Sequence, residues 1–503
     1  PGDSRYVSDE ILFRLAEERG LNPEMVVSIA HRLGWEKLSV RVGLSADMAA
    51  RNAQMTKSAA RTQSVRGILS KDLNPTSSGY YEDTTATEFE AAVLSCLPLS
   101  GEDISILKLS GEVNSVPSHA IILDHTLFYP EGGGQLGDQG TLSFSGTKVD
   151  ILDTRIEEGV ILHLADSDVE SGKRVKGNVD WTRRKQLMDH HTAIHIVGGS
   201  AREELGSHVW QAGSNKGARY ARLDITHHSR LSRDELDKIE DRANDIIASE
   251  LAIEKLVLDR EEADSRFGFE IYQGGPPKHD TIRVIKIGEF DIQACGGTHH
   301  DSTESVGELR IIRSSQVQDG VERLQVVAGD TAREHARKQE RLLSEASETL
   351  GVQPDDLPRA VTRFFEEWKS QQKRIESLEA EIVRLRTSGG DDGAVERDGI
   401  RYAIMEVDGG IKALMSMLGE LTRDPSKPTL AVLGTKDGGG KIIIAITEGT
   451  KAAEAHNAVE ILNSISTHID GGGGGSPTMA QGGGSNPDGI PAALEAARQI
   501  LGL

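Results

Sequence analysis

Apolar and polar residues change their spacing several times along the chain, and each change predicts a different kind of structure. Near the N-terminus apolar residues recur at helical spacing, with further helical fragments near 46–60, so residues 1–84 are predicted to form a helical linking segment. Residues 85–180 turn to short alternating or β-branched runs separated by glycine and aspartate. That pattern predicts a β-rich, barrel-like subdomain.

The remaining residues divide into three more parts. Residues 181–330 mix helical stretches with strands such as IRVIKIG and ERLQVVAG, which indicates an α+β layer. Residues 331–390 predict a helical pair interrupted by glycine and proline. Residues 391–503 have a β-α-β-β-α pattern that predicts a small α/β domain, with a glycine-rich stretch near its end. We therefore expect an α+β multidomain protein.

The second helix of the pair carries large apolar residues at a spacing of three and four, typical of a helix that packs along one face. They are Val361, Phe364, Trp368, Ile375, Leu378, Ile382 and Leu385. Antiparallel packing of the two helices within one chain is favoured, and a seam between two copies of the chain is the alternative.

Composition limits the class of protein. Hydrophobic residues make up 37% of the 503, and no apolar run approaches the roughly 20 residues that span a bilayer. The two cysteines, Cys96 and Cys295, exclude a disulfide framework and indicate a reducing cytoplasm. Cys96 lies in an apolar run and is predicted to be a small buried side chain. We therefore expect a cytoplasmic protein without a membrane partner.

Charge argues against nucleic acid as the partner, because a net charge of −22 repels phosphate. Basic residues nevertheless cluster locally at 181–185, 216–222 and 333–341. Each cluster is either a solvated face or a contact for RNA, and composition alone favours the first.

The residues best suited to chemistry are two separated pairs of metal-binding side chains. His191 and His195 are four apart and project from the same face of a helix. Cys295 and His299 follow about a hundred residues later, with two glycines between them. Three imidazoles and one thiolate suit a tetrahedral Zn²⁺, so we expect one zinc per chain.

Neighbouring histidines compete for two of these positions. His190 precedes the first predicted ligand and His300 follows the last. His190 lies about 100° around the helix from His191 and would break the four-residue spacing. The pattern therefore favours His-x3-His and Cys-x3-His.

These motifs resemble the editing domain of alanyl-tRNA synthetase, above all that of its archaeal branch. The resemblance rests on DHHTAIHIVGG (189–199) and ACGGTHH (294–300), together with four further segments in the family's order. Those segments are FYPEGGGQ (128–135), HVWQAGSNKGARYARLDITH (208–227), YQGG (272–275) and QDGVERLQVVAG (318–329). The resemblance covers roughly residues 85–503.

The resemblance implies further site residues and partners. Thr126 and Gln135 are expected at the pocket, with Thr126 bonded to a serine hydroxyl, while Asp224 and Arg222 either brace the site or form a structural salt bridge. The partner would be tRNA(Ala), bound at its acceptor end and at its elbow. The glycine-rich stretch 471–484 resembles the family's C-terminal domain, which contacts the elbow and mediates homodimerisation; Ser476 stands where the family often has a basic residue.

Adenylate-forming motifs and a phosphate loop are not recognisable in the sequence. The chain is therefore expected to be the editing and C-terminal half of an alanine–tRNA ligase, without ligase activity of its own. Its function would be zinc-dependent hydrolysis of Ser-tRNA(Ala) and Gly-tRNA(Ala). One alternative is a non-catalytic tRNA-binding and dimerisation arm with a structural zinc, and another is an unrelated metallohydrolase acting on a small ester.

Overall fold

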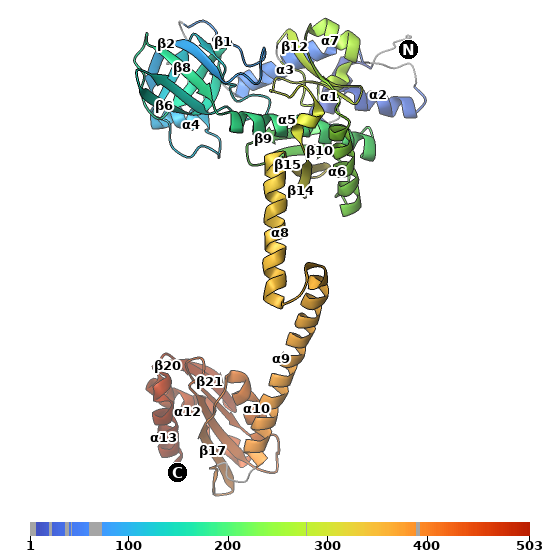
Figure 1. Cartoon of the computed structure of the whole chain (residues 1–503). Helices are drawn as coiled ribbons and strands as arrows, with labels where there is room; N and C mark the ends of the chain where they lie inside the picture. Colours follow the sequence, from blue (N-terminus) through green and yellow to red (C-terminus); the bar gives the residue numbers. More distant parts are fainter. Residues whose placement is uncertain are drawn as a thin grey trace. The chain divides into compact units, whose positions relative to one another are not determined.

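Two compact units make up the chain, Pro1–Leu342 and Leu343–Leu503. The computed structural model describes residues 7–19, 23–35, 40–41, 43–59, 73–277, 279–388 and 393–503 (Figure 1). Helices and strands are mixed in the first unit, and a mixed sheet covered by helices forms the second. The predicted α+β class is confirmed.

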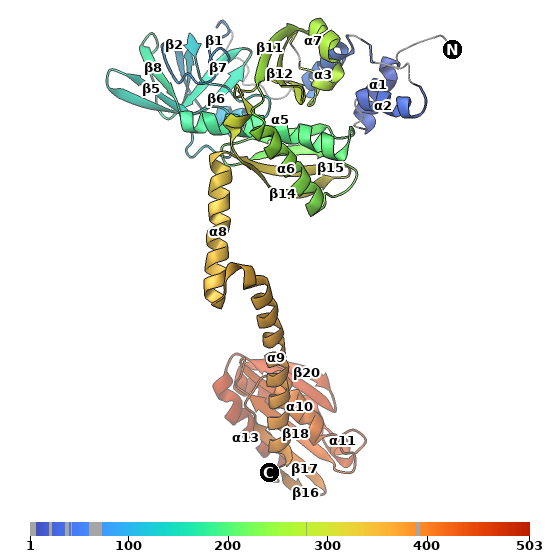
Figure 2. The ribbon, with the colours of Figure 1, turned by 45° about the vertical axis from the view of Figure 1, so that its right-hand side comes forward.

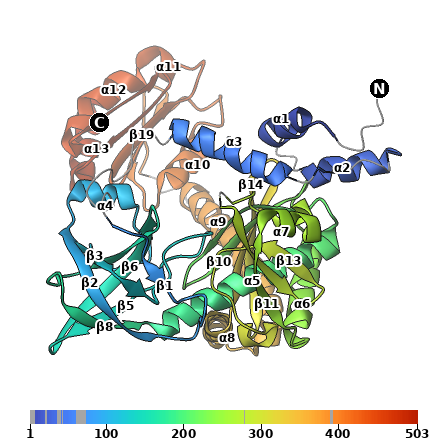
Figure 3. The same ribbon diagram turned by 90° about the horizontal axis from the view of Figure 1, so that it is seen from above.

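Three helices open the first unit: α1 (Asp9–Arg19), α2 (Pro23–Arg32) and α3 (Leu44–Ala59). Residues 60–72 of the predicted linking segment lie outside the described residues. Helix α3 lies beside α7 (Arg260–Phe267), as Figure 3 shows, where the Ser45 hydroxyl donates to Asp264 at 2.5 Å. The helical segment is thus packed against the α+β layer that follows.

Six strands then close a barrel in the order β2-β3-β7-β6-β5-β8. Buried and exposed residues alternate along several of them, most regularly in β8, because alternate side chains of a strand point to opposite faces. The strands are β2 (Glu88–Pro98), β3 (His119–Leu123), β5 (Gly140–Phe144), β6 (Thr147–Glu157), β7 (Val160–Ala165) and β8 (Arg174–Val179). Short elements accompany them: β1 (Ser77–Ser78), α4 (Gly101–Leu107) and β4 (His125–Thr126).

Helix α5 (Trp181–Leu205) extends from the barrel to the α+β layer, as Figures 1 and 2 show. Asp180 caps its N-terminus by accepting the backbone N–H of Arg183. From Arg183 to Ala201 nearly every residue is buried, which is typical of a helix enclosed on all sides. Polar side chains in this stretch therefore need partners inside the protein.

Two sheets and one long helix enclose the C-terminal part of α5. A four-stranded sheet has the order β14-β15-β10-β9, and a three-stranded sheet the order β11-β12-β13. The strands are β9 (Gln211–Lys216), β10 (Ala221–Thr226), β11 (Ile253–Asp259), β12 (Thr281–Ile287), β13 (Asp291–Ala294), β14 (Leu309–Gln318) and β15 (Val321–Ala328), and the helix is α6 (Arg233–Ala248). Their apolar side chains form one core with Ile194 and Val197 of α5.

The predicted helical pair is present as α8 (Asp330–Leu350) and α9 (Leu357–Ser388). Large apolar side chains along α9 are exposed: Val361, Phe364, Phe365, Trp368, Ile375, Leu378 and Ile382. The side chain of Leu385 lies outside the description. Antiparallel packing of the two helices therefore stays a prediction, and the row is an exposed apolar surface of the second unit.

The C-terminal domain is a six-stranded sheet with helices on both faces. Its order is β16-β17-β18-β19-β21-β20, and β17 and β18 are parallel. Helix α10 covers one face, and α12 and α13 cover the other. The elements are β16 (Val395–Arg397), β17 (Ile400–Glu406), α10 (Ile411–Leu421), β18 (Thr429–Thr435), β19 (Gly440–Ile446), α11 (Lys451–Ala455), α12 (Ala458–Ile465), β20 (Gly471–Ser476), β21 (Met479–Gly484) and α13 (Ile490–Leu501).

The glycine run that resembled a linker forms part of this sheet. Strands β20 and β21 pair antiparallel along their whole length. A Cβ atom on Gly473 would lie 2.1 Å from the backbone oxygen of Gln481, and one on Gly475 would lie 2.1 Å from that of Met479. Glycine is therefore required for the two strands to approach so closely.

A buried ion pair joins α5 to the barrel. The Arg184 guanidinium is fully buried and donates through Nε to both oxygens of Asp138, at 3.0 and 2.8 Å. It also donates to the backbone oxygens of Thr84, at 3.1 Å, and Leu127, at 2.7 Å. Every partner lies N-terminal to α5, so one side chain ties the barrel to the helix that carries His191 and His195.

We predict that Arg184→Leu lowers the free energy of unfolding by about 3–5 kcal/mol, because Asp138 is left as an unpaired buried charge. Urea denaturation followed by circular dichroism measures this change. Arg174→Leu is the matched control, because Arg174 pairs at 3.8 Å with Glu90 and both side chains are largely exposed. Its expected change is below about 1 kcal/mol. Equal effects of the two substitutions would contradict the assignment.

Candidate metal centre

Four side chains from two separate segments converge in the first unit. His191 and His195 come from α5, and Cys295 and His299 come from the loop after β13. One donor atom from each lies within 4.8 Å of all the others. The Cys295 sulfur is 3.2 Å from Nε2 of His191 and 3.4 Å from Nε2 of His299. The structure thus brings together all four predicted ligands.

Each imidazole also faces an oxygen through its other nitrogen. Nδ1 of His191 lies 2.7 Å from Oε1 of Gln135, and Nδ1 of His299 lies 3.2 Å from the hydroxyl of Thr192. Nδ1 of His195 is 3.6 Å from Asp291 and has no hydrogen-bond partner among the described residues. Such outer partners fix the ring orientation and leave Nε2 for a metal ion. The nitrogen and sulfur donors therefore fit a tetrahedral zinc.

The loop that carries Cys295 is held by backbone contacts. Arg283 donates through Nη1 to the backbone oxygens of Cys295, at 2.9 Å, and Gly297, at 2.8 Å. Gly297 packs against the first ligand, since a Cβ atom there would lie 1.9 Å from Cε1 of His191. Only glycine allows the loop to approach the helix so closely.

The electrostatics of the cluster favour the deprotonated forms of Cys295, His191 and His299, which are the forms that bind a metal ion. Burial raises the pKa of Cys295, but the three facing imidazoles outweigh it and hold the pKa well below its usual value. Burial lowers the pKa of His191 to about 4 and that of His299 well below normal. For His195, Cys295 and Asp291 outweigh burial and raise the pKa to about 9, so a cation competes there with a proton.

The competing histidines are engaged elsewhere. Nδ1 of His190 lies 2.6 Å from the backbone oxygen of Gly217, and its Nε2 is 2.9 Å from the Thr331 hydroxyl. Nε2 of His300 lies 2.7 Å from Asp189. Neither ring contributes to the cluster, in agreement with the predicted spacing.

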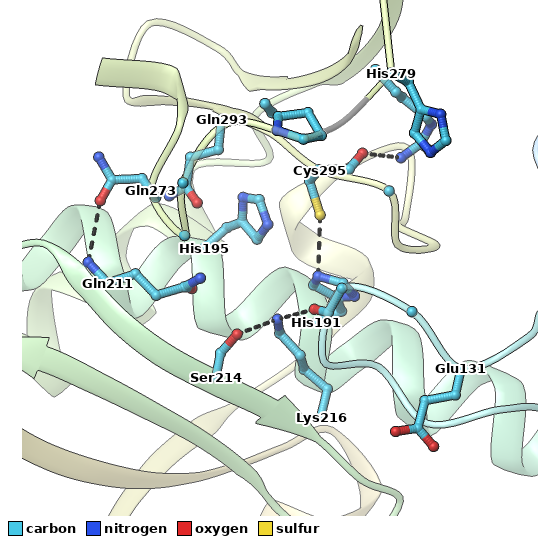
Figure 4. A pocket seen from close by; sticks show the side chains of 18 of the residues that line it. Glu131, His191, His195, Gln211, Ser214, Lys216, Gln273, His279, Gln293 and Cys295 are labelled. Atoms are coloured by element: carbon cyan, nitrogen blue, oxygen red, sulfur yellow. Dashed lines mark hydrogen bonds between the residues drawn. The ribbon is translucent and has the colours of Figure 1, made fainter. Parts of the chain in front are cut away.

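A cavity of about 1180 Å³ opens beside the cluster (Figure 4). His191, His195 and Cys295 form part of its wall, together with aromatic, amide and glycine residues. Those residues include Tyr80, Tyr81, Tyr129, Gly132, Gly133, Gln211, Gln273 and Gln293. The guanidinium of Arg283 lies 4.6 Å from the ring centroid of Tyr81. The cluster is therefore accessible to a ligand much larger than water.

Sequence reasoning missed Lys216, which lines the same cavity and is only 3% exposed. Its ammonium donates to the backbone oxygen of Gly133 at 2.9 Å and to the hydroxyl of Ser214 at 2.7 Å (Figure 4). No carboxylate pairs with it in the described part of the chain. Burial lowers the pKa of Lys216 to about 8. The sequence signals were its place in the basic cluster 216–222 and in the segment 208–227 that resembles the family.

The other predicted residues occupy different positions. Gln135 braces the first ligand and also bonds Thr298, through its Nε2 atom at 2.9 Å. Thr126 is fully buried with its hydroxyl 2.8 Å from Nε2 of His163, and it does not line the cavity. Its expected contact with a serine hydroxyl stays a prediction.

Asp224 lies on β10 and accepts two hydrogen bonds from Arg323, at 2.7 and 2.9 Å. Arg222 is 3.8 Å from the same carboxylate. Neither residue lines the cavity. Of the two alternatives left open for this pair, the geometry matches the structural salt bridge.

We predict that Gly297→Ala weakens metal binding at the cluster by about 10- to 100-fold or more, because its Cβ atom displaces the His191 ring. Titration with Co²⁺, followed through the thiolate-to-cobalt absorption of Cys295, measures the change. The neighbouring Gly296→Ala is the control, since its Cβ atom would lie 3.6 Å from the Tyr81 hydroxyl. Wild-type affinity in the Gly297 variant would refute this account of the loop.

No helix in the described residues is long and apolar enough to cross a membrane.

Three family models match the chain. The model "tRNA synthetases class II (A)" matches residues 2–183, which include the predicted linking segment and the barrel. The "Threonyl and Alanyl tRNA synthetase second additional domain" matches 282–325, which contain Cys295 and His299, and the "DHHA1 domain" matches 399–503.

The chain is also similar to proteins named alanine–tRNA ligase. It is 38% identical to that of Natronomonas pharaonis over 98% of this chain and 51% of the relative. It is 37% identical to that of Halorubrum lacusprofundi, over 99% of this chain and 51% of the relative. It is 36% identical to that of Methanopyrus kandleri, over 96% of this chain and 51% of the relative. The chain thus spans about half the length of the curated relatives it matches.

Among solved structures, the C-Ala domain of Aquifex aeolicus alanyl-tRNA synthetase matches 20% of this chain and 89% of its own length, at 25% identity and a TM-score of 0.18. The three family models fall on the helical segment and barrel, on the sheet that carries two predicted ligands, and on the C-terminal domain. The relatives match nearly the whole chain under a single name. The chain therefore belongs to the alanyl-tRNA synthetase family.

Proposed function

We propose that this chain hydrolyses the ester bond of serine or glycine wrongly attached to tRNA(Ala), in the cytoplasm and with one zinc at the cluster. The observation that carries the proposal is the placement of three predicted ligands in the wall of a large open cavity. A purely structural zinc needs no such access. Family membership supplies the substrate class.

The chemistry of selecting alanine explains why a hydrolytic site is needed. Glycine lacks one methyl group, and serine carries one more hydroxyl. A small pocket rejects neither strongly, because a methylene-sized difference is worth only about 1–3 kcal/mol. A second site that removes the wrong amino acid after attachment is the general solution.

The cavity suits the 3′ end of an aminoacylated tRNA. Its aromatic side chains, Tyr80, Tyr81 and Tyr129, offer faces on which an adenine base can stack. The amides of Gln211, Gln273 and Gln293 offer donors and acceptors for ribose and amino-acid hydroxyls. A volume of about 1180 Å³ is large enough for a nucleoside with its amino acid.

His191, His195, Cys295 and His299 would hold the zinc. When bound, Zn²⁺ supplies Lewis-acid polarisation of a carbonyl or a more acidic water, and a shell filled by four protein donors favours orientation of the substrate. Gln135 accepts the Nδ1 hydrogen of His191 and holds that ring in place, while Thr192 faces His299 in the same way. These contacts keep the donor atoms fixed as substrate enters.

Lys216 is the group best placed to bind the ester carbonyl. Its ammonium carries three donors, and two of them are used by Gly133 and Ser214. We propose that the third donates to the carbonyl oxygen and stabilises the negative charge that develops there. The backbone of Lys216 is fixed by hydrogen bonds to Gly134, at 2.7 Å, and Leu136, at 3.1 Å, on either side of Gln135.

The reaction is a simple hydrolysis. Water adds to the carbonyl carbon, and the carbon–oxygen bond to the ribose then breaks. The ribose oxygen takes up a proton and becomes a free hydroxyl, while serine or glycine leaves as the acid. Alanine differs from serine by one hydroxyl group, so selectivity for serine over alanine requires a polar contact that alanine cannot make.

A second candidate function is a tRNA-binding and dimerisation arm in which the zinc is structural. The exposed apolar row along α9 favours it, since contiguous apolar surface marks protein interfaces. We propose homodimerisation through the C-terminal region and contact with the tRNA elbow in addition to hydrolysis. The two functions make different predictions about the cluster.

Purified full chain is expected to hydrolyse Ser-tRNA(Ala) at least about tenfold faster than Ala-tRNA(Ala), as judged by release of labelled amino acid. Chelation of the metal should abolish turnover, and added zinc should restore it. Intact Ser-tRNA(Ala) at every zinc loading would exclude the hydrolytic function.

Cys295→Ala distinguishes the two candidates within the same assay. If the zinc serves hydrolysis, the variant keeps its far-ultraviolet circular dichroism and loses deacylation. If the zinc is structural, the first unit unfolds instead, as small zinc-dependent domains do.

Lys216→Met is expected to lower kcat for deacylation by about 10²–10³-fold, as loss of an oxyanion donor does. KM should stay within about threefold, because the contact strengthens only as charge develops. Zinc content and circular dichroism are expected to be unchanged. Lys176→Met, on the barrel surface, is the control. An unchanged kcat would exclude Lys216 from the reaction.

A further inference from the structure

A second group of imidazoles lies at the opposite end of the β9–β10 hairpin from Lys216. His208 precedes β9, and His227 and His228 directly follow β10. The two strands run antiparallel, with Gln211 opposite Ile225. The start of one strand therefore meets the end of the other, and the three histidines come together there.

The rings converge closely enough to share one ion. Nε2 of His208 lies 2.9 Å from Nδ1 of His227. One nitrogen from each of the three rings lies within 4.8 Å of the other two. Zinc–nitrogen bonds of about 2.0–2.1 Å separate ligand nitrogens by a little over 3 Å, so small ring movements suffice.

Among the described residues, the ring nitrogens of His208 and His227 face one another and Ser229 and no charged side chain. No carboxylate forms an ion pair with any of the three rings in the described part of the chain. Ser229 is the other polar side chain at hydrogen-bond distance, 3.4 Å from Nε2 of His227. Burial and the neighbouring imidazoles lower the pKa of His208 and of His227, which favours the neutral form that binds metal ions.

Accessibility supports an exchangeable site. His227 is buried, His208 is half-buried and His228 is exposed. An ion can therefore enter from solvent, and one coordination position stays open to water. Three imidazoles with one open position are a recognised ligand set for zinc, distinct from the closed set of three imidazoles and one thiolate.

We propose that His208, His227 and His228 form a second zinc site, independent of the cluster at Cys295. An ion there joins the chain before β9 to the chain after β10. It would stabilise the base of the hairpin whose other end carries Lys216. The site does not depend on the proposed hydrolysis.

Metal stoichiometry and the spectrum of Co²⁺ separate the two sites. The full chain, stripped of metal and dialysed against zinc, is expected to hold two equivalents by atomic emission, and His228→Ala to hold one. His228 is exposed, so its loss should leave the fold intact. His468→Ala, an exposed histidine of the C-terminal domain, is the matched control and should hold two.

Cobalt shows which equivalent is lost. His228→Ala should bind one Co²⁺ with the full thiolate-to-cobalt absorption and should deacylate at the wild-type rate. Cys295→Ala should also bind one Co²⁺, without that absorption. A single equivalent in the wild-type chain, or two in His228→Ala, would overturn the second site and leave the proposed hydrolysis untouched.

Discussion

Convergence of three imidazoles and one sulfur on a single point is the constraint that the first unit is built around. Buried polar groups are costly unless each has a partner. In this structure the outer nitrogens of His191 and His299 face the oxygens of Gln135 and Thr192, and a carboxylate, Asp291, lies near His195. The fold must therefore bring α5, the 132–136 loop and the loop after β13 together, and it must hold them there.

The buried pair of Arg184 and Asp138 meets part of this requirement at the barrel end of α5. Three contacts of one guanidinium reach the loop before β5, the segment before the barrel and the residue that follows β4. At the other side, Arg283 holds the Cys295 loop through two backbone oxygens. Arg184 thus holds the chain on either side of the glycine loop, and Arg283 holds the Cys295 loop. The cavity is lined by residues of these two loops and of β9.

The β9–β10 hairpin connects the cavity beside Cys295 with the group formed by His208, His227 and His228. At one end Lys216 places a buried ammonium in the cavity wall, and at the other end three imidazoles meet. Lys216 is held there by Gly133 and Ser214, and His208 lies at hydrogen-bond distance from His227. Each group thus has partners in the protein and keeps donor or acceptor capacity for a ligand. In the second unit, glycine serves packing instead, because β20 and β21 approach too closely for a Cβ atom.

Local patterns in the sequence were enough to predict most elements and the four side chains that the structure brings together. Alternation predicted the barrel strands, helical spacing predicted α9, and the two four-residue spacings favoured His191 over His190 and His299 over His300. Each of these features depends on residues that are close together in the sequence, so it can be predicted without the tertiary structure. Tertiary structure alone decided the rest. It buried Lys216 beside the cluster, paired Asp224 with Arg323, enclosed Thr126 with His163 and brought His208 to His227, because each of these contacts joins segments whose meeting depends on how strands and helices pack.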